Sequence, residues 1–113
     1  IGFTTIDLSG NLMFQYSDDN LCALFVDLQI SELYLNDNYF TKLPTCMFQR
    51  CEIRNLYLNR NRITHIQNGL FQFQFMFDLL DLSQNTISSI DGNAFESLRK
   101  GPYSTVKMHD NLL

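Results

Sequence analysis

The chain has 113 residues, a length that allows one domain at most. Apolar residues make up 45% of it and charged residues 18%, a composition typical of globular rather than disordered proteins. The net charge of −4 argues against a nucleic-acid partner, and no apolar run approaches the length of a membrane span.

Five nine-residue phrases with one pattern follow each other along the chain. They cover residues 3–11, 30–38, 53–61, 77–85 and 103–111, and they end on Asn11, Asn38, Asn61, Asn85 and Asn111. The first, fourth and sixth positions of each phrase are apolar. Because strand side chains alternate faces, we expect a short strand in each phrase with the fourth and sixth residues buried. We expect the asparagines, called here the asparagine ladder, to bond the backbone of neighbouring turns.

A second apolar phrase follows each of the first four asparagines. It contains one regularly placed phenylalanine, and the four predicted to stack as an aromatic spine are Phe25, Phe48, Phe71 and Phe95. The last three lie ten residues after their asparagine, whereas Phe25 lies fourteen residues after Asn11. The difference predicts a four-residue insertion within residues 14–20, which we expect to be a solvated loop.

Two further segments carry local predictions. Residues 71–77 alternate phenylalanine with polar or unbranched residues, which favours an extended segment. Gly101 and Pro102 predict a turn before the last strand.

The three cysteines match no zinc motif. Cys22 and Cys46 lie three and two residues before the spine phenylalanines of adjacent repeats, so a disulfide is possible although the register differs by one residue. Cys51 stands where other repeats have leucine, and we expect a buried, inert thiol. The odd number of cysteines leaves the redox compartment open.

The sequence indicates no catalytic, metal or cofactor site. His65 and His109 are isolated and are expected on different faces of the coil, so they do not form a metal site. We find no Ser/His/Asp or Cys/His set that the repeat would bring to one face, and no glycine-rich phosphate loop. We therefore expect a protein that is not an enzyme.

Together the two phrases read L-x-x-L-x-L-x-x-N-x-Φ-x-x-Φ-x-x-x-x-F-x-x-L, where Φ is apolar. This pattern, with Leu43-Pro44, resembles the typical class of leucine-rich repeat, which is common in animal extracellular proteins such as Toll-like receptors and Slit-like proteins. The resemblance implies an α/β-class leucine-rich repeat solenoid, a horseshoe arc of about four to five coils. Short parallel strands would line its concave face, and the convex side would be irregular.

The resemblance also implies a domain organisation. Residues 1–113 form a single leucine-rich repeat domain, with coils at 1–27, 28–51, 52–75, 76–100 and, incomplete, 101–113. Both ends read as ordinary repeat instead of the atypical sequence of capping coils, so we expect a fragment of a longer array.

The residues that alternate with the buried pairs are candidates for binding on the concave face. Tyr34 and Tyr57 should lie side by side, and the surrounding candidates are Arg54, Arg60, Asn36, Asn59, Asp81 and Asp7. Tyrosine and arginine are enriched at binding hot spots. Tyrosines on a sheet also arise from strand propensity and cross-strand pairing alone, which is the alternative interpretation.

We expect a protein-recognition module of a cell-surface or secreted receptor, in innate immunity or cell adhesion, with an extracellular or cell-surface location. The alternative is a cytoplasmic leucine-rich repeat scaffold or regulatory subunit, and the absence of an N-x-S/T glycosylation sequon mildly favours it. The expected partner is a protein; a glycan or lipid ligand and dimerisation are further possibilities.

Overall fold

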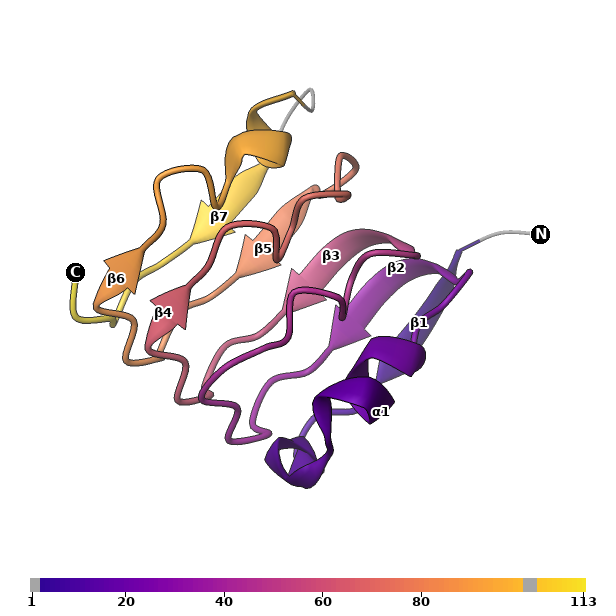
Figure 1. Cartoon of the computed structure of the whole chain (residues 1–113), viewed down its shortest axis with the longest axis horizontal. Helices are drawn as coiled ribbons and strands as arrows, with labels where there is room; N and C mark the ends of the chain where they lie inside the picture. Colours follow the sequence, from indigo (N-terminus) through magenta and orange to yellow (C-terminus); the bar gives the residue numbers. More distant parts are fainter. Residues whose placement is uncertain (1–2, 101–103) are drawn as a thin grey trace.

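The computed structural model describes residues 3–100 and 104–113, and its main element is a five-stranded parallel sheet. The strand order β1-β2-β3-β5-β7 follows the chain, so each repeat adds one strand beside the previous one (Figure 1). The strands are β1 (Thr4–Asp7), β2 (Gln29–Tyr34), β3 (Glu52–Tyr57), β5 (Leu79–Asp81) and β7 (Thr105–Lys107). A parallel sheet built in this way fits a repeat solenoid.

The register of the sheet places equivalent repeat positions opposite each other. One row joins Asp7 to Tyr34, Tyr34 to Tyr57, Tyr57 to Asp81 and Asp81 to Lys107. The hydrogen bonds continue one residue beyond each strand, for example from the Leu35 N–H to the Tyr57 carbonyl at 2.8 Å. Outward positions therefore form rows across the sheet, except at the start of β1, where the register shifts between Thr4 and Thr5.

The core lies between this sheet and a second, smaller layer formed by β4 (His65–Ile66) and β6 (Ser89–Ile90), which pair in parallel. The inward pairs of the three central strands are completely buried: Leu33 and Leu35, Leu56 and Leu58, and Leu80 and Leu82. The corresponding pairs of the outer strands, Ile6 with Leu8 and Val106 with Met108, are only partly buried.

The four spine phenylalanines stack in sequence through the core. Ring centroids are 6.5 Å apart between Phe25 and Phe48, 6.0 Å between Phe48 and Phe71, and 6.2 Å between Phe71 and Phe95. Their planes are tilted by only 13–15°. The regular placement of these residues in the sequence thus corresponds to a column of four stacked rings.

The asparagine ladder joins adjacent coils through side-chain amides. The Asn61 Oδ1 accepts from the N–H groups of Asn38 (2.9 Å) and Phe40 (3.0 Å), and its Nδ2 donates to the carbonyls of Leu35 and Leu58. The other interior ladder residues make the same kinds of bond, whereas the Asn11 amide donates only within its own coil, to the Ser9 carbonyl at 3.2 Å. Each interior asparagine satisfies backbone groups at a buried bend.

The insertion in the first coil is solvated as expected, since residues 14–20 are all exposed, but it forms helical turns, so the expectation of a loop was wrong. A 3₁₀ turn, η1 (Met13–Gln15), precedes the helix α1 (Asp18–Ala23), which Ser17 caps by accepting from the Asn20 N–H. Met13 and Leu21 are buried beneath these turns. The insertion therefore covers the core of the first coil (Figure 1).

Residues 71–77 do not run extended, and that prediction was wrong. Phe71, Gln74 and Phe77 are buried while the residues between them are exposed, and the Gln74 N–H bonds the Phe71 carbonyl at 3.0 Å. The segment therefore turns, and its buried residues recur every three positions instead of every two. A second 3₁₀ turn, η2 (Glu96–Lys100), lies at the equivalent place in the next coil, and the predicted turn at Gly101 and Pro102 lies outside the described residues.

Candidate functional site

The sheet has one side turned away from the core, called here the open sheet face. At its centre is the row of Asp7, Tyr34, Tyr57, Asp81 and Lys107. The repeat sequence explains the arrangement, because D-L-S occurs in the first and fourth phrases and Y-L-N in the second and third. Two tyrosine strands consequently lie between two aspartate strands.

Tyr34 and Tyr57 stack directly on each other, with ring centroids 4.5 Å apart and planes 8° from parallel. Both side chains are half-buried. The Tyr34 hydroxyl donates to the Glu32 Oε2 at 3.2 Å. Desolvation raises the pKa of Tyr34, and the nearby Glu32 charge raises this pKa further, so the phenol stays neutral and acts as a donor.

The aspartates on either side of the tyrosines share one local geometry. The Asp7 Oδ1 accepts from the Ser9 N–H at 3.0 Å and from the Ser9 hydroxyl at 2.6 Å, and Asp81 does the same with Ser83. The bonds from Ser9 hold the pKa of Asp7 below its usual range. Each side chain is therefore held by one oxygen at the end of its strand.

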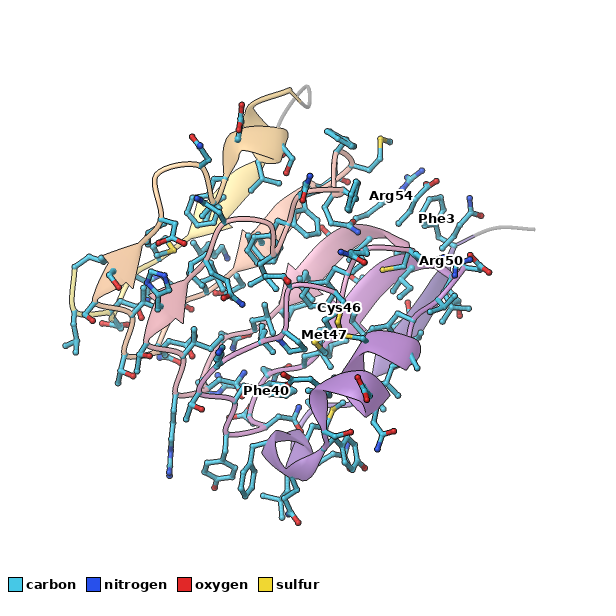
Figure 2. All side chains as sticks on the ribbon, in the orientation of Figure 1. Phe3, Phe40, Cys46, Met47, Arg50 and Arg54 are labelled. Carbon is cyan, nitrogen blue, oxygen red and sulfur yellow. A yellow bond between two sulfur atoms is a disulfide. The ribbon has the colours of Figure 1, made fainter. Side chains whose placement is uncertain are left out.

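The two predicted arginines are engaged away from the tyrosine pair. The Arg54 guanidinium lies 4.2 Å from the centre of the Phe3 ring, and Figure 2 shows the two residues side by side near the N-terminal end of the sheet. Arg60 forms a two-pronged ion pair with Asp37, at 3.0 Å from Nε to Oδ1 and 3.0 Å from Nη2 to Oδ2. Hydrogen bonding within this pair lowers the pKa of Asp37 and raises that of Arg60.

Asn36 and Asn59 follow the tyrosines on the same face. The Asn36 Nδ2 donates to the Asp37 Oδ2 at 2.7 Å. The Oδ1 atoms of both asparagines are buried and accept no hydrogen bond from the described residues. Such acceptors are unfavourable for stability unless an ordered water or a partner satisfies them.

The other predicted residues lie away from this face and have structural positions. Cys22 in α1 and Cys46 form a disulfide with their Cα atoms 5.3 Å apart, which joins the insertion to the second coil (Figure 2). Cys51 is a free, partly buried thiol whose pKa is raised by burial to about 11. The ladder asparagines and spine phenylalanines are bonded or packed within the coils.

A Ser/His/Asp cluster does form, contrary to the prediction that no such set shares a face. The His65 Nδ1 lies 2.6 Å from the Ser89 hydroxyl, and its Nε2 lies 2.9 Å from the Asp91 Oδ1. Ser89 and Asp91 belong to the next coil, more than twenty residues after His65 in the sequence. The His65 and Asp91 side chains are 42% and 38% exposed. A hydrolytic site would also need aligned oxyanion donors and a water-excluding pocket, and this cluster lies on an open surface.

Sequence reasoning missed three residues with clear roles. Glu32 orients the Tyr34 hydroxyl, Phe3 lies under Arg54, and Gln74 donates to backbone carbonyls of the preceding coil. Glu32 occupies an outward position of the same repeat as Tyr34, and that position was the available signal. Gln74 stands at a leucine position of the repeat, and that replacement was its signal, whereas nothing in the local sequence distinguished Phe3 from a packing residue.

Within residues 3–100 and 104–113, no group of three or more His, Cys, Asp or Glu side chains could hold a metal ion. In the same ranges, the helices are too short and too polar to cross a membrane.

A family model described as Leucine rich repeat matches residues 51–100. Searches of the curated proteins and of the solved structures gave no match. The matched residues include β3 to β6 and η2, and the same strand and ladder geometry continues on both sides of them. The match and the parallel sheet together support a leucine-rich repeat protein, and such repeats generally mediate protein–protein interaction and are not typically enzymes.

Proposed function

We propose that this leucine-rich repeat chain is a protein-recognition module that binds a protein ligand on its open sheet face. The observation that carries the proposal is the stacked pair of Tyr34 and Tyr57 at the centre of that face. Stacked tyrosines offer a rigid, half-exposed aromatic surface with polar tips, the chemistry most common at binding hot spots. In this proposal the sheet is the concave side of an arc.

Two features of the surroundings support a role in recognition. The side chains around the pair are held by specific bonds, such as Asp7 to Ser9 and Tyr34 to Glu32, so little ordering is needed on binding. The buried acceptors of Asn36 and Asn59 are unfavourable for stability and lie directly beside the tyrosines. Strand propensity accounts for the tyrosines alone but not for these neighbours.

The test uses a phage-displayed library of random short peptides selected against the wild-type chain. We expect the selected peptides to lose about thirtyfold or more in affinity for Tyr57→Ala or Tyr34→Ala, measured by titration calorimetry. Tyr16→Ala is the matched control, because Tyr16 is 49% exposed but lies in the insertion. Peptides that bind all three variants equally would reject the sheet face as the binding surface.

We further propose an extracellular or cell-surface location, as part of a receptor or adhesion protein. The disulfide between Cys22 and Cys46 supports this, because such bonds persist mainly in oxidising compartments. The test is to alkylate the protein rapidly in its native source and determine its mass. We expect one alkylated cysteine, Cys51, after unfolding; three alkylated cysteines would favour the intracellular scaffold instead.

A further inference from the structure

We propose that the open sheet face selects a basic segment of its protein partner, with a lysine or arginine side chain bound between the Asp7 carboxylate and the outer ring face of Tyr34. This inference rests on the recognition function proposed above and adds the chemical class of the ligand. It follows from the direction of the rings, the distribution of charge and the position of Asp7.

The stacking of the tyrosines determines which ring faces are open. Their centroid separation of 4.5 Å is close to the spacing of about 4.8 Å between neighbouring strands, so the stacking direction runs across the strands. The outer face of Tyr34 is therefore turned toward β1, and that of Tyr57 toward β5. Asp7 and Asp81 are the residues in register on those two sides.

Each aspartate is shorter than its tyrosine neighbour and is bonded to a serine at the end of its own strand. The aspartate side chain consequently leaves the outer face of the tyrosine ring uncovered. Its carboxylate lies beside the part of the ring that is nearest to the sheet. A carboxylate next to an exposed tyrosine face attracts a cation twice, through the charge and through the ring quadrupole.

The charges around the tyrosine pair favour a cationic ligand. Asp7, Glu32 and Asp81 place three carboxylates near the rings. The two arginines that the sequence placed near the tyrosines already have partners: Arg54 lies over the Phe3 ring, and Arg60 forms an ion pair with Asp37. A segment rich in lysine or arginine is thus complementary to this face, whereas an acidic segment meets like charge.

The two sides of the pair differ in how well their carboxylate is neutralised. Asp81 lies in register with Lys107, and its charge contributes to the raised pKa of Arg60, so cations of the protein already lie near it. Neither Asp7 nor Glu32 takes part in an ion pair among the described residues. The pair formed by Asp7 and Tyr34 is therefore the main site for the basic side chain.

The experiment uses the peptides selected from the random library on the wild-type chain. We expect lysine and arginine to be enriched in these peptides. Their affinity should fall about tenfold with Asp7→Asn and with Glu32→Gln at low salt. Raising the salt concentration should weaken binding to the wild-type chain more than binding to these two variants, because salt screens the charges that the substitutions remove. Asp7→Asn keeps an oxygen that accepts from Ser9, so the local geometry is retained. Asp19→Asn, in α1, is the control with the same loss of charge, and thermal unfolding shows whether the variants remain folded.

Two other results separate this inference from the proposed function. In the first, the selected peptides lack basic residues, and their binding is lost with Tyr34→Ala but is unchanged by Asp7→Asn and Glu32→Gln. This result would overturn the proposal of a basic ligand and leave the sheet face as the binding surface. Peptides unaffected by any of these substitutions, the tyrosines included, would overturn both proposals.

Discussion

At the scale of single residues, the position before each of the five ladder asparagines adopts a left-handed backbone. The φ angles are 69° for Gly10, 61° for Asp37, 52° for Arg60, 56° for Gln84 and 59° for Asp110. Only the first coil has glycine there, and for the others this conformation costs about 1 kcal/mol through crowding of the Cβ atom. The strain recurs because the strand must turn sharply before the asparagine.

Gln84 allows this strain to be tested, since it is exposed and carries no ion pair comparable to that of Arg60. Gln84→Gly should stabilise the fold by about 0.5 kcal/mol, because relief of the left-handed strain exceeds the added freedom of the unfolded chain. Urea denaturation measures the change. Gln29→Gly, in the regular strand β2, is the control and should destabilise the protein; a loss of stability with Gln84→Gly as well would contradict this account.

Gln74 replaces a leucine of the repeat pattern and acts as a second kind of polar clamp. Its Oε1 accepts from the Ile53 N–H at 3.1 Å, and its Nε2 donates to the carbonyls of Phe48 (2.7 Å) and Cys51 (2.8 Å). The side chain is 1% exposed. It connects the third coil to the second on the opposite side of the coil from the asparagine ladder.

Restoring the pattern with Gln74→Leu should therefore destabilise the protein, by about 2 kcal/mol. The leucine gains hydrophobic burial, but it leaves one backbone N–H and two carbonyls without their partner in a buried place. Chemical denaturation gives the free energy of unfolding, and Gln72→Leu, at an exposed position of the same turn, should change it little. If Gln74→Leu were as stable as wild type, the three bonds would contribute nothing net.

The sequence predicted the residues whose role repeats and failed where a role occurs once. The ladder asparagines and spine phenylalanines recur at a fixed place, and Tyr34 and Tyr57 follow from alternation along a strand. Gln74, by contrast, is a single exception, and two of its three partners, the carbonyls of Phe48 and Cys51, lie in another coil. The cluster of His65, Ser89 and Asp91 escaped for the same reason, because the exact stacking register decides which side chains meet.

At the scale of elements, the helix α1 shows what the repeat pattern cannot predict. The length difference in the first coil indicated an insertion but not its conformation. The local signals were present in Ser17 followed by Asp18 and Asp19, a capping residue with acidic residues in the first turn. These signals lead to a stable helix only because Leu21 is buried against the coil and Cys22 is bonded to Cys46.

Removing the disulfide should weaken this element more than the rest. Cys22→Ser combined with Cys46→Ser should cost about 3 kcal/mol, because the bond closes a loop across 24 residues. Denaturation with urea measures the total, and hydrogen exchange should show the largest loss of protection in α1. Cys51→Ser, which removes a thiol but no bridge, is the control. Equal stability of the double variant and wild type would show that α1 is held by packing alone.

At the scale of the whole molecule, each coil contacts only its neighbours, so stability depends on position along the array. Inward residues of the central strands, such as Leu33 and Leu56, are completely buried between two coils. Their counterparts Ile6 and Val106 are only partly buried, because β1 and β7 each pair with a strand on one side of the sheet order. In a solenoid, stability is approximately a sum of coil and interface contributions.

Amide exchange should therefore be slowest in β2 and β3 and fastest among the strands in β1 and β7. The outer strands can open by breaking one interface, whereas a central strand must break two. Hydrogen exchange followed by mass spectrometry on the 113-residue chain measures this order. Leu56→Ala and Val106→Ala give an independent check, with an expected loss of about 3 kcal/mol for the first and about half as much for the second. Equal protection in all five strands would mean that the coils unfold as one cooperative unit, and that the interfaces are too strong for any coil to open alone.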